Sequence, residues 1–546
     1  MRHKNLPGLA TATDIIFSYH QDSKHHLNAY AKGPDTIDWS AQPVAFRHYS
    51  NTAVIDLPFI KDSLTVKYDD LFILNRIKPQ QLTIATLAGF FELSMGLSAW
   101  KQYGTDRWAQ RCNPSSGNLH PTEAYALLTD IETISDGIYH YCSDEHQLEQ
   151  RGLLNKVTSI TSNTPGSLFV CLSSIHWREA WKYGERAFRY SQLDIGHAIA
   201  ALRYAAACFG WSIEIQSHTN TDELDTLFGF DRPDDFIENE KENAEVFLKI
   251  NTFDNDNTKI AELTNKIKSI RYYGKANILD NKHFYDWPVI DSIETATRNP
   301  GIVEEKNTGN VSTYPDIKSS SSVEAATIIR QRRSAQHFDN TSIMSQDVFY
   351  QLLDKILTRK NIPPFDLLHV PACIHPILFI HRVDGLAKGL YALPRNNSAV
   401  DLLKTEMRDN FLWQAIESCP SHIPLYKLIL ANSQNAARTL FCQQDIAADS
   451  AFSMGMLAEF KNNIIDKPWQ YRDLFWEAGI LGQSMYLEAE AHNFRATGIG
   501  CFYDDNFHEL LGLKSDNLQS LYHFTVGTPI VDNRLVSLSP YAHIQR

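Results

Sequence analysis

Small and apolar residues recur at helical spacing in two stretches of the chain, residues 188–211 and 471–494. In the first stretch the apolar positions follow one another at steps of four and three, which places them on one face of a helix. These positions are Ile195, Ile199, Leu202, Ala206 and Phe209. Both stretches are also rich in glycine and alanine, and such small side chains allow helices to approach closely. The pattern predicts two closely packed helices, one in each half of the chain.

The two helical stretches align with each other without a gap, in a constant register that pairs position 188 with position 471. The aligned pairs are Phe188/Tyr471, Arg189/Arg472, Gly196/Gly479 and Ala206/Ala489. A weaker match joins residues 136–139 to residues 388–391, and each of these follows a strand-like apolar run. Chance similarity between two alanine-rich helices is the alternative. The constant register and the second ordered match favour an internal repeat, and with it a fused pseudo-dimer.

One segment, residues 300–322, differs from the rest of the chain in composition. It is polar, has almost no large aliphatic residues and ends in four serines. Such a stretch buries too little apolar surface to offset its ordering entropy, so we interpret it as a linker. The expected organisation is a lead-in over residues 1–80, a domain over 81–299, the linker, and a second domain over 323–546.

Composition and charge narrow the class of protein. Of the 546 residues, 43% are hydrophobic and 21% are charged, as in ordinary globular proteins. The net charge of −13 argues against a nucleic-acid partner. The chain has no apolar run of the ~18 residues that a membrane helix needs, and its first residues lack the apolar core of a signal peptide. Eight cysteines without a CxxC pair argue against a disulfide framework and a zinc ribbon, so no metal is expected. We predict a soluble, cytoplasmic protein without a membrane partner.

Arg332, Arg333 and Ser334 follow a predicted helix at the start of the second domain. Two adjacent guanidinium groups can each make charge-assisted contacts to a phosphate, and the serine adds a hydroxyl group. Gln336, two positions further on, is a fourth polar candidate. The alternative is that these cations only complement the dipole at the end of the helix.

A second polar segment, residues 111–123, precedes the strand-like run AYALL in the first half. Its proline, serines, glycine and asparagine favour a tight turn whose N–H and hydroxyl groups can contact a planar polar ring or a ribityl chain. The candidate binding residues are Pro114, Ser115, Ser116 and Asn118. An ordinary capped loop is the alternative for this segment considered alone.

Together these motifs resemble the nitroreductase-like flavoprotein superfamily. The form Asn-Pro-Ser-Ser-Gly-Asn-Leu-His-Pro, residues 113–121, is similar to its SagB/ThcOx branch of azoline dehydrogenases. Two further segments resemble that branch: the Lys-Tyr-x-x-Arg-x-x-Arg pattern with the following Gly-His over residues 182–197, and the closing element over residues 497–529. The resemblance covers about residues 80–546, and the lead-in resembles the N-terminal segment of two-domain members.

The resemblance implies an α+β fold in which two fused nitroreductase-like domains form an intramolecular pseudo-dimer with FMN at their interface. One domain would supply Arg332, Arg333 and Ser334 to the phosphate, and the other would supply the Pro114–Asn118 loop. Backbone groups of Gly498, Ile499 and Gly500 are expected at the flavin N5 edge, where glycine allows close approach. Arg534 is a third candidate cation. Because the mirror-related positions lack both motifs, we expect one FMN per chain.

Lys182 and Tyr183 are the candidates for proton handling, because oxidising an azoline ring removes a proton and a hydride and so needs a base. A solvated lysine beside a core tyrosine is the alternative, and His120 is a further candidate. The function expected is an FMN-dependent dehydrogenase acting on azoline-like rings in a peptide or a related small substrate. A nitro or quinone reductase using NAD(P)H and a catalytically silent scaffold are the alternatives. Further oligomerisation of the pseudo-dimer is left open.

Overall fold

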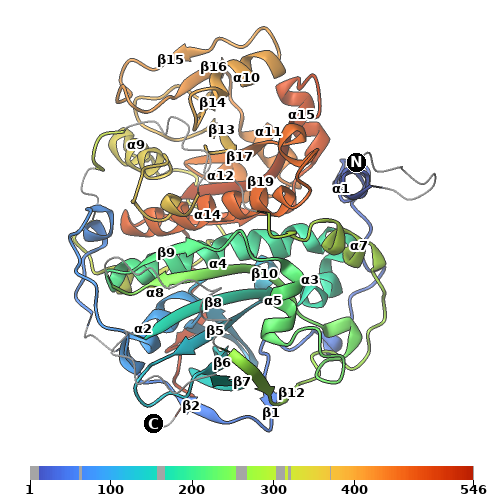
Figure 1. Ribbon diagram of the computed structural model, residues 1–546. Coiled ribbons are helices and arrows are strands. Elements are labelled where there is room, and N and C mark those ends of the chain that lie inside the picture. The colour runs from blue at the N-terminus through green and yellow to red at the C-terminus, as the bar shows by residue number, and fades with distance from the viewer. Residues whose placement is uncertain are drawn as a thin grey trace.

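The computed structural model describes residues 11–60, 64–156, 166–253, 267–302, 314–317, 321–368 and 371–544. Two α+β domains lie one above the other in Figure 1, as the resemblance implied. The long helices α4 (Ala187–Cys208) and α14 (Gln470–Ala491) run side by side between the two sheets. Within the described residues, none of the helices has the length and apolar character required to cross a membrane.

The first domain is built on an antiparallel sheet with the order β11-β7-β6-β5-β8-β10-β9, and β2 also pairs with β7. The strands are β2 (Val54–Asp56), β5 (Thr122–Thr129), β6 (Gly137–Cys142), β7 (Gln147–Lys156), β8 (Ser167–Ser174), β9 (Ser212–Ile215), β10 (Asn243–Asn251) and β11 (Ile267–Tyr272). Its other helices are α2 (Ile84–Ser94), α3 (His176–Tyr183), α5 (Thr221–Phe228) and α7 (Pro288–Ala296). The whole of β5 is buried, which explains the apolar run AYALL at its centre.

The second domain repeats this arrangement with the order β15-β16-β14-β13-β17-β19-β18. Its strands are β13 (Ile374–Ile380), β14 (Gly389–Ala392), β15 (Gln414–Ala415), β16 (Tyr426–Leu430), β17 (Phe452–Glu459), β18 (Arg495–Ile499) and β19 (Leu518–Gly527). Its other helices are α8 (Ala325–Gln331), α9 (Gln346–Lys355), α10 (Ala399–Glu406), α11 (Gln434–Leu440), α12 (Asp445–Asp449), α13 (Lys461–Ile464) and α15 (Asp504–Leu511). In both sheets the strand that follows the long central helix, β9 or β18, forms one edge.

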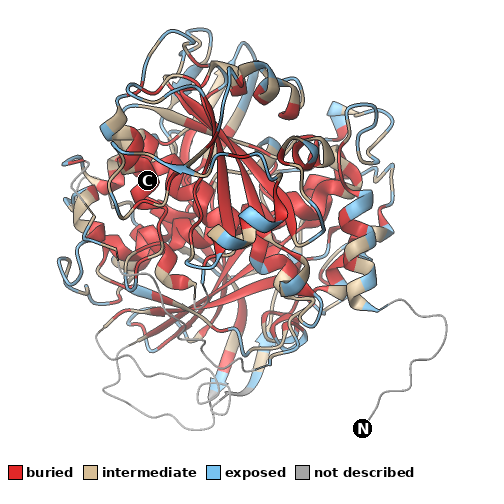
Figure 2. Ribbon diagram, turned by 90° about the horizontal axis from the view of Figure 1, so that it is seen from above, coloured by how far each residue is buried: buried red, intermediate tan, exposed pale blue. Residues whose placement is uncertain are grey.

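The two central helices form the middle of the core. Every residue of α4 is buried, because the helix packs both on its own domain and on α14. Figure 2 shows buried residues concentrated in the interior of the molecule and exposed residues towards its periphery. Small residues beside the apolar face of α4 allow α14 to pack closely against it. The register of the repeat pairs the first residue of α4 with the first of α14, and the last with the last. The predicted pair of equivalent helices is therefore confirmed.

Both ends of the chain cross between the domains. Helix α1 (Ala12–Asp22) reaches the second domain, where Thr13 donates to the carbonyl oxygen of Ile465 and His20 is hydrogen-bonded to Tyr471. At the other end, β20 (Val536–Leu538) extends a hairpin of the first domain formed by β3 (Leu97–Tyr103) and β4 (Asp106–Arg111). These exchanged ends join the two domains into one unit.

The predicted linker falls mostly on residues 303–313 and 318–320, which lie outside the described residues. Its described part is not separate from the domains. Tyr314 and Ile317 are partly buried against the main hydrophobic core, and Arg359 donates to the carbonyl oxygen of Pro315 at 3.0 Å. The segment therefore passes along the surface of the second domain where it is described.

Two of the eight cysteines are bonded to each other. Cys442 and Cys501 form a disulfide with a Cα–Cα distance of 5.8 Å, whereas the other six cysteines are free. The two bonded residues are 59 positions apart, and the fold brings them together by packing the turn after α11 against the start of α15. The chain has no framework of several bridges, but it does have this one.

Candidate functional site

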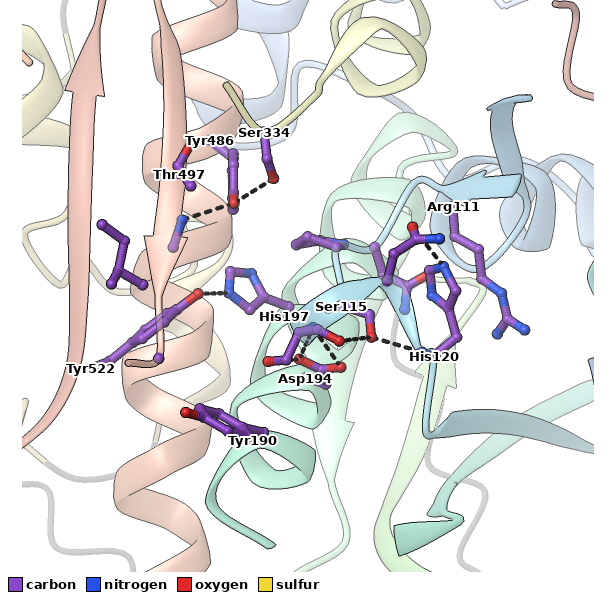
Figure 3. A pocket seen from close by; sticks show the side chains of 18 of the residues that line it. Arg111, Ser115, His120, Tyr190, Asp194, His197, Ser334, Tyr486, Thr497 and Tyr522 are labelled. Carbon is purple, nitrogen blue, oxygen red and sulfur yellow. Dashed lines mark hydrogen bonds between the residues drawn. The ribbon is translucent and has the colours of Figure 1, made fainter. Parts of the chain in front are cut away.

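A cavity of about 350 Å³ lies between the two domains. The first domain contributes the end of β4, the loop over residues 113–118 and one face of α4. The second domain contributes the residues after α8, Tyr486 on α14, the end of β18 and Tyr522 on β19. Figure 3 shows the two sets of side chains facing each other across the space. The two motifs that the sequence placed at one site are therefore brought together here, from opposite halves of the chain.

The Pro114–Asn118 loop is held against α4 by a buried carboxylate. Ser116 donates its backbone N–H and its hydroxyl to Asp194, both at 3.1 Å. Ser115 Oγ accepts from the His120 N–H at 2.8 Å. Gly117 and Asn118 both have positive φ, +58° and +59°, which permits the tight turn. These contacts fix the four predicted loop residues at the wall of the cavity.

Asp194 has an unusual environment for a carboxyl group. Only 2% of the residue is exposed, and no cation pairs with it among the described ion pairs. Burial raises the pKa of Asp194 to about 7, although the hydrogen bonds from Ser115 and Ser116 act in the opposite direction. A group that titrates near neutral pH therefore holds the loop.

Arg332 is a buried cation at the opposite wall. Its Nε donates to the carbonyl oxygen of Cys112 at 3.2 Å and its Nη2 to that of Arg111 at 3.0 Å. No carboxylate lies within ion-pair distance of Arg332 in the described part of the chain, and burial lowers the pKa of its guanidinium. A buried charge without a counter-ion is costly, so this position favours an anionic ligand. Nearby, the Ser334 and Tyr486 hydroxyls share a hydrogen bond of 2.8 Å.

The other predicted cations lie outside the cavity wall. Arg333 donates to three backbone carbonyl oxygens, those of Arg330, Arg332 and Ser98. Burial and the charge of Arg332 lower the pKa of Arg333 to about 10. Arg534 is exposed and paired with Asp532, and Gln336 is exposed as well. The structure thus brings Arg332 and Ser334 to the cavity but leaves Arg333, Gln336 and Arg534 away from its wall.

Gly498 in β18 and Gly500 just after the strand allow side chains to approach the backbone closely. A Cβ on Gly498 would collide with the Tyr522 hydroxyl, and one on Gly500 would collide with the Tyr190 ring. The Gly498 N–H donates to Tyr486 Oη at 2.9 Å. Gly498, Ile499 and Gly500, the three residues expected at the flavin edge, all line the cavity. Only glycine fits at the first and third of these positions.

Two arginines of the first domain hold the end of β18 in place. Arg186 Nη2 donates to the Gly500 carbonyl oxygen at 3.0 Å. Arg186 and Arg189 both pair with Asp504, the first residue of α15, at 3.0 and 2.8 Å. Burial alone would raise the pKa of Asp504, but the two arginines hold it well below its usual range. The Lys-Tyr-x-x-Arg-x-x-Arg motif therefore positions the backbone of the other domain.

A histidine and a tyrosine meet across the domain interface at the cavity. His197 Nε2 on α4 and the Tyr522 hydroxyl on β19 share a hydrogen bond of 3.1 Å (Figure 3). His197 Nδ1 lies 3.3 Å from Gln483 Oε1 on α14. Burial lowers the pKa of His197 to about 3, so its ring is neutral and serves as a hydrogen-bonding group.

Lys182 and Tyr183, the predicted proton-handling pair, lie beside the loop at the edge of the cavity. A Cβ on Gly117 would come within 2.5 Å of Tyr183 Oη and 3.3 Å of Lys182 Nζ. Tyr183 lines the cavity. Burial lowers the pKa of Lys182 and raises that of Tyr183 well above its usual range. Tyr183 therefore stays protonated, and Lys182 is the more readily available base of the two.

His120, the further candidate, also lies at the wall. Its backbone has a φ of +53°, and its Nε2 lies 3.2 Å from Asn118 Oδ1. Burial lowers the pKa of His120 well below its usual range. The ring is therefore neutral in the folded protein.

The position related to the cavity by the pseudo-twofold is different. The register of the repeat relates Ile215 to Gly498 and Gln216 to Ile499, so a branched side chain stands where the first glycine lies. The strand β9 begins after Trp211, which is 2% exposed and donates its indole N–H to the carbonyl oxygen of Gln80. Arg203 donates to the Trp211 carbonyl oxygen and pairs with Asp366. Bulky and internally paired side chains occupy this region.

Comparison with known proteins agrees with the fold. The Nitroreductase family profile matches residues 97–237 and 329–528, one segment in each domain and together more than half of the chain. The chain belongs to the nitroreductase family. It is 23% identical over 173 residues to a provisionally named nitroreductase of Methanocaldococcus jannaschii, a match covering 29% of this chain and 81% of that protein.

Two solved structures resemble this nitroreductase-family chain to different extents. A provisionally named nitroreductase from Anabaena variabilis ATCC 29413 superposes with a TM-score of 0.66 and 20% identity, over 94% of this chain and 99% of that one. That match extends through both domains and supports the fused arrangement. A provisionally named nitroreductase from Exiguobacterium sibiricum, solved in complex with FMN, covers 41% of this chain and 92% of its own at 12% identity, with a TM-score of 0.22.

The residues at the cavity of this nitroreductase-family protein are suited to FMN. Arg332 supplies a buried positive charge for the phosphate, and no carboxylate among the described residues pairs with it. Buried polar atoms at the wall, Gln110 Oε1, Asn113 Oδ1 and His120 Nδ1, have no hydrogen-bond partner among the described residues. The heteroatoms of a flavin ring and the hydroxyls of its ribityl chain are groups that such atoms bind.

Several residues at the site had no role in the sequence prediction. They are Arg111, Tyr190, Asp194, His197, Gln444, Tyr486 and Tyr522. Asp194 and His197 lie within a segment that carried the resemblance, and their helical spacing of three would have put both on one face of α4. Tyr486 and Tyr522 had no such signal, because their partners Ser334 and His197 are 152 and 325 positions away in the chain.

Proposed function

We propose that this nitroreductase-family protein is an FMN-dependent dehydrogenase that oxidises azoline-like rings in a peptide or a related small substrate. Bound FMN would supply a two-electron acceptor that takes a hydride from the substrate carbon. Arg332 and Ser334 would hold its phosphate, and the Pro114–Asn118 loop would bind the polar edge of the ring. The backbone from Gly498 to Gly500 would lie beside the ring, held there by Arg186.

The observation that supports this proposal most is the position of Lys182 and Tyr183. Both reach Gly117 of the loop, and Tyr183 lines the cavity. Forming an aromatic azole from an azoline needs a base at the substrate carbon as well as a hydride acceptor. Burial lowers the pKa of Lys182, which makes its neutral, proton-accepting form more accessible. Tyr183, which stays protonated, can orient the substrate by donating a hydrogen bond.

The test is a single turnover without oxygen. The purified holoenzyme, in excess over a synthetic peptide with one thiazoline ring, should lose its flavin absorbance while the peptide loses two hydrogens, as measured by mass spectrometry. An unchanged peptide together with fast bleaching by NAD(P)H would favour the nitro or quinone reductase instead. A folded protein without flavin would favour the scaffold.

A further inference from the structure

A disulfide forms part of the wall of the cavity between the domains. Cys501 follows Gly500 directly and lines the cavity, and it is bonded to Cys442. Cys442 lies in the turn between α11 and α12, and Gln444, two positions later, lines the same cavity. The bridge thus joins two segments that both face the proposed flavin site.

The size of the cavity brings its wall close to any large ligand. At about 350 Å³ it is at the lower end of the range for ligand pockets. A three-ring cofactor with a phosphorylated side chain would fill this space and contact the residues that line it. Cys501 is one of those residues, whereas Cys442 is not among them. Cys501 is therefore the cysteine of this pair that lies on the flavin side.

Buried positive charge lies beside the peptide group that precedes Cys501. Arg186 donates to the carbonyl oxygen of Gly500, the residue immediately before Cys501. Arg186 and Arg189 are both buried and share a single buried carboxylate, that of Asp504. This group carries one excess positive charge beside the Cys501 peptide. A thiolate is stabilised by a neighbouring arginine, and thiolates are the reactive form in disulfide chemistry.

The turn that contains Cys442 has a backbone that L-residues rarely adopt. Cys442 has a φ of +52° and the next residue, Gln443, has a φ of +59°. Neither is a glycine, so the conformation is unfavourable without the contacts that impose it. Opening the bridge would release one of those constraints. The redox state of the bridge is thereby linked to the segment that carries Gln444 to the cavity.

We propose that Cys442 and Cys501 form a second redox centre that exchanges two electrons with the flavin; the proposal rests on the proposed function, since it needs a flavin in the cavity. In the exchange the S–S bond breaks, and the two sulfur atoms gain two electrons and two protons to become two thiols. The reduced flavin supplies those two electrons and two protons and becomes oxidised. Cys501 is the residue at which the exchange occurs, and Cys442 is released as its partner thiol.

The first test uses the wild-type holoenzyme and needs no substitution. The flavin is reduced without oxygen by illumination with EDTA, and thiols are then alkylated with iodoacetamide and located by peptide mass spectrometry. The proposal predicts new alkylation at Cys442 and Cys501 after illumination. The apoprotein treated in the same way should show none, because it lacks the flavin that absorbs the light. A fully bleached flavin with the bridge still intact would overturn the proposal.

The second test counts electrons. In an anaerobic dithionite titration, the wild type should take up twice as many electrons per flavin as the double variant Cys442→Ser/Cys501→Ser. The variant Cys419→Ser, which removes a free and partly exposed cysteine, should behave as the wild type does. Equal uptake by the wild type and the double variant would contradict the redox centre while leaving the flavin and the proposed function in place. A protein that binds no FMN would contradict both.

Discussion

Gly196 of α4 and Gly479 of α14 pack directly against each other where the two central helices cross. A Cβ on Gly196 would lie 2.9 Å from Gly479 Cα, and a Cβ on Gly479 would lie 2.8 Å from Gly196 Cα. These two glycines are equivalent positions of the internal repeat. A contact between equivalent residues is what a twofold axis produces. The pseudo-twofold axis of the molecule therefore passes between Gly196 and Gly479.

This contact predicts an unusual response to alanine. In a helix interior, glycine to alanine normally stabilises a protein by about 0.5–1 kcal/mol. Here the added methyl group of Gly196→Ala would press on the backbone of Trp476, so we expect a loss of about 1–3 kcal/mol instead. Urea denaturation measures this change in the free energy of unfolding. Gly33→Ala is the control, because a Cβ there meets no atom within 4 Å. A stabilised Gly196→Ala variant would contradict this close packing of the two helices.

Arg332 and Arg333 should differ in their effect on cofactor binding. Arg332→Ala removes the buried guanidinium at the cavity, and we expect FMN affinity to fall about ten- to a hundredfold, as for a lost charge-assisted contact. Arg333→Ala should have a smaller effect, because Arg333 binds backbone carbonyl groups outside the wall. Arg534→Ala should have none. Fluorescence titration of the apoprotein with FMN provides the three dissociation constants. If Arg332→Ala and Arg534→Ala weaken FMN binding equally, the phosphate does not bind at Arg332.

Lys182 and Tyr183 should affect chemistry without affecting flavin retention. We expect Lys182→Ala and Tyr183→Phe to keep FMN but to slow azoline oxidation by on the order of a hundredfold if they handle the substrate proton. Quinone reduction by NAD(P)H needs no such base and should remain near the wild-type rate. The ratio of the two activities in one preparation is the measurement. If both activities and the flavin content fall together, the pair is structural; if neither activity falls, His120 becomes the next candidate.

Asp194 should make stability depend on pH near neutrality. Its pKa is about 7 in the folded protein and about 3.9 in an unfolded chain, so the folded state binds more protons between these values. The stabilisation by the protonated carboxyl is fully present below about pH 4 and is lost as the pH rises towards 7. Relative to Asp194→Asn, which does not titrate, the wild type should lose up to about 1.4 kcal/mol per pH unit in that range. The test compares the urea midpoints of the wild type and Asp194→Asn across this pH range. Curves of midpoint against pH that run parallel for the two proteins would contradict the prediction.

Some parts of the site can be predicted from the sequence better than others. Residues that act through local patterns were found: the small residues of α4 and α14, the turn-forming Pro114–Asn118 loop, and Arg332 at the end of a helix. Residues that act through distant partners were missed or misplaced. Arg186 bonds to Asp504, 318 positions away, and no local pattern shows that it positions Gly500.

Arg534 and the disulfide illustrate the same limit. Arg534 follows β19 in the chain, but there the backbone turns outward and the side chain pairs with Asp532 two positions earlier. Cys442 and Cys501 become neighbours only through the packing of α11 against α15. A pairing of this kind depends on the tertiary fold, and the spacing of the cysteines in the sequence does not reveal it.

We propose that one flavin lies across the interface of the two domains, because the mirror-related region carries Ile215 at the position of Gly498 and a buried Trp211 just before β9. The direct measurement is the amount of flavin released when protein saturated with FMN, and freed of excess cofactor, is denatured. We expect one FMN per chain. Two FMN per chain would contradict it, because the mirror position would then bind flavin as well.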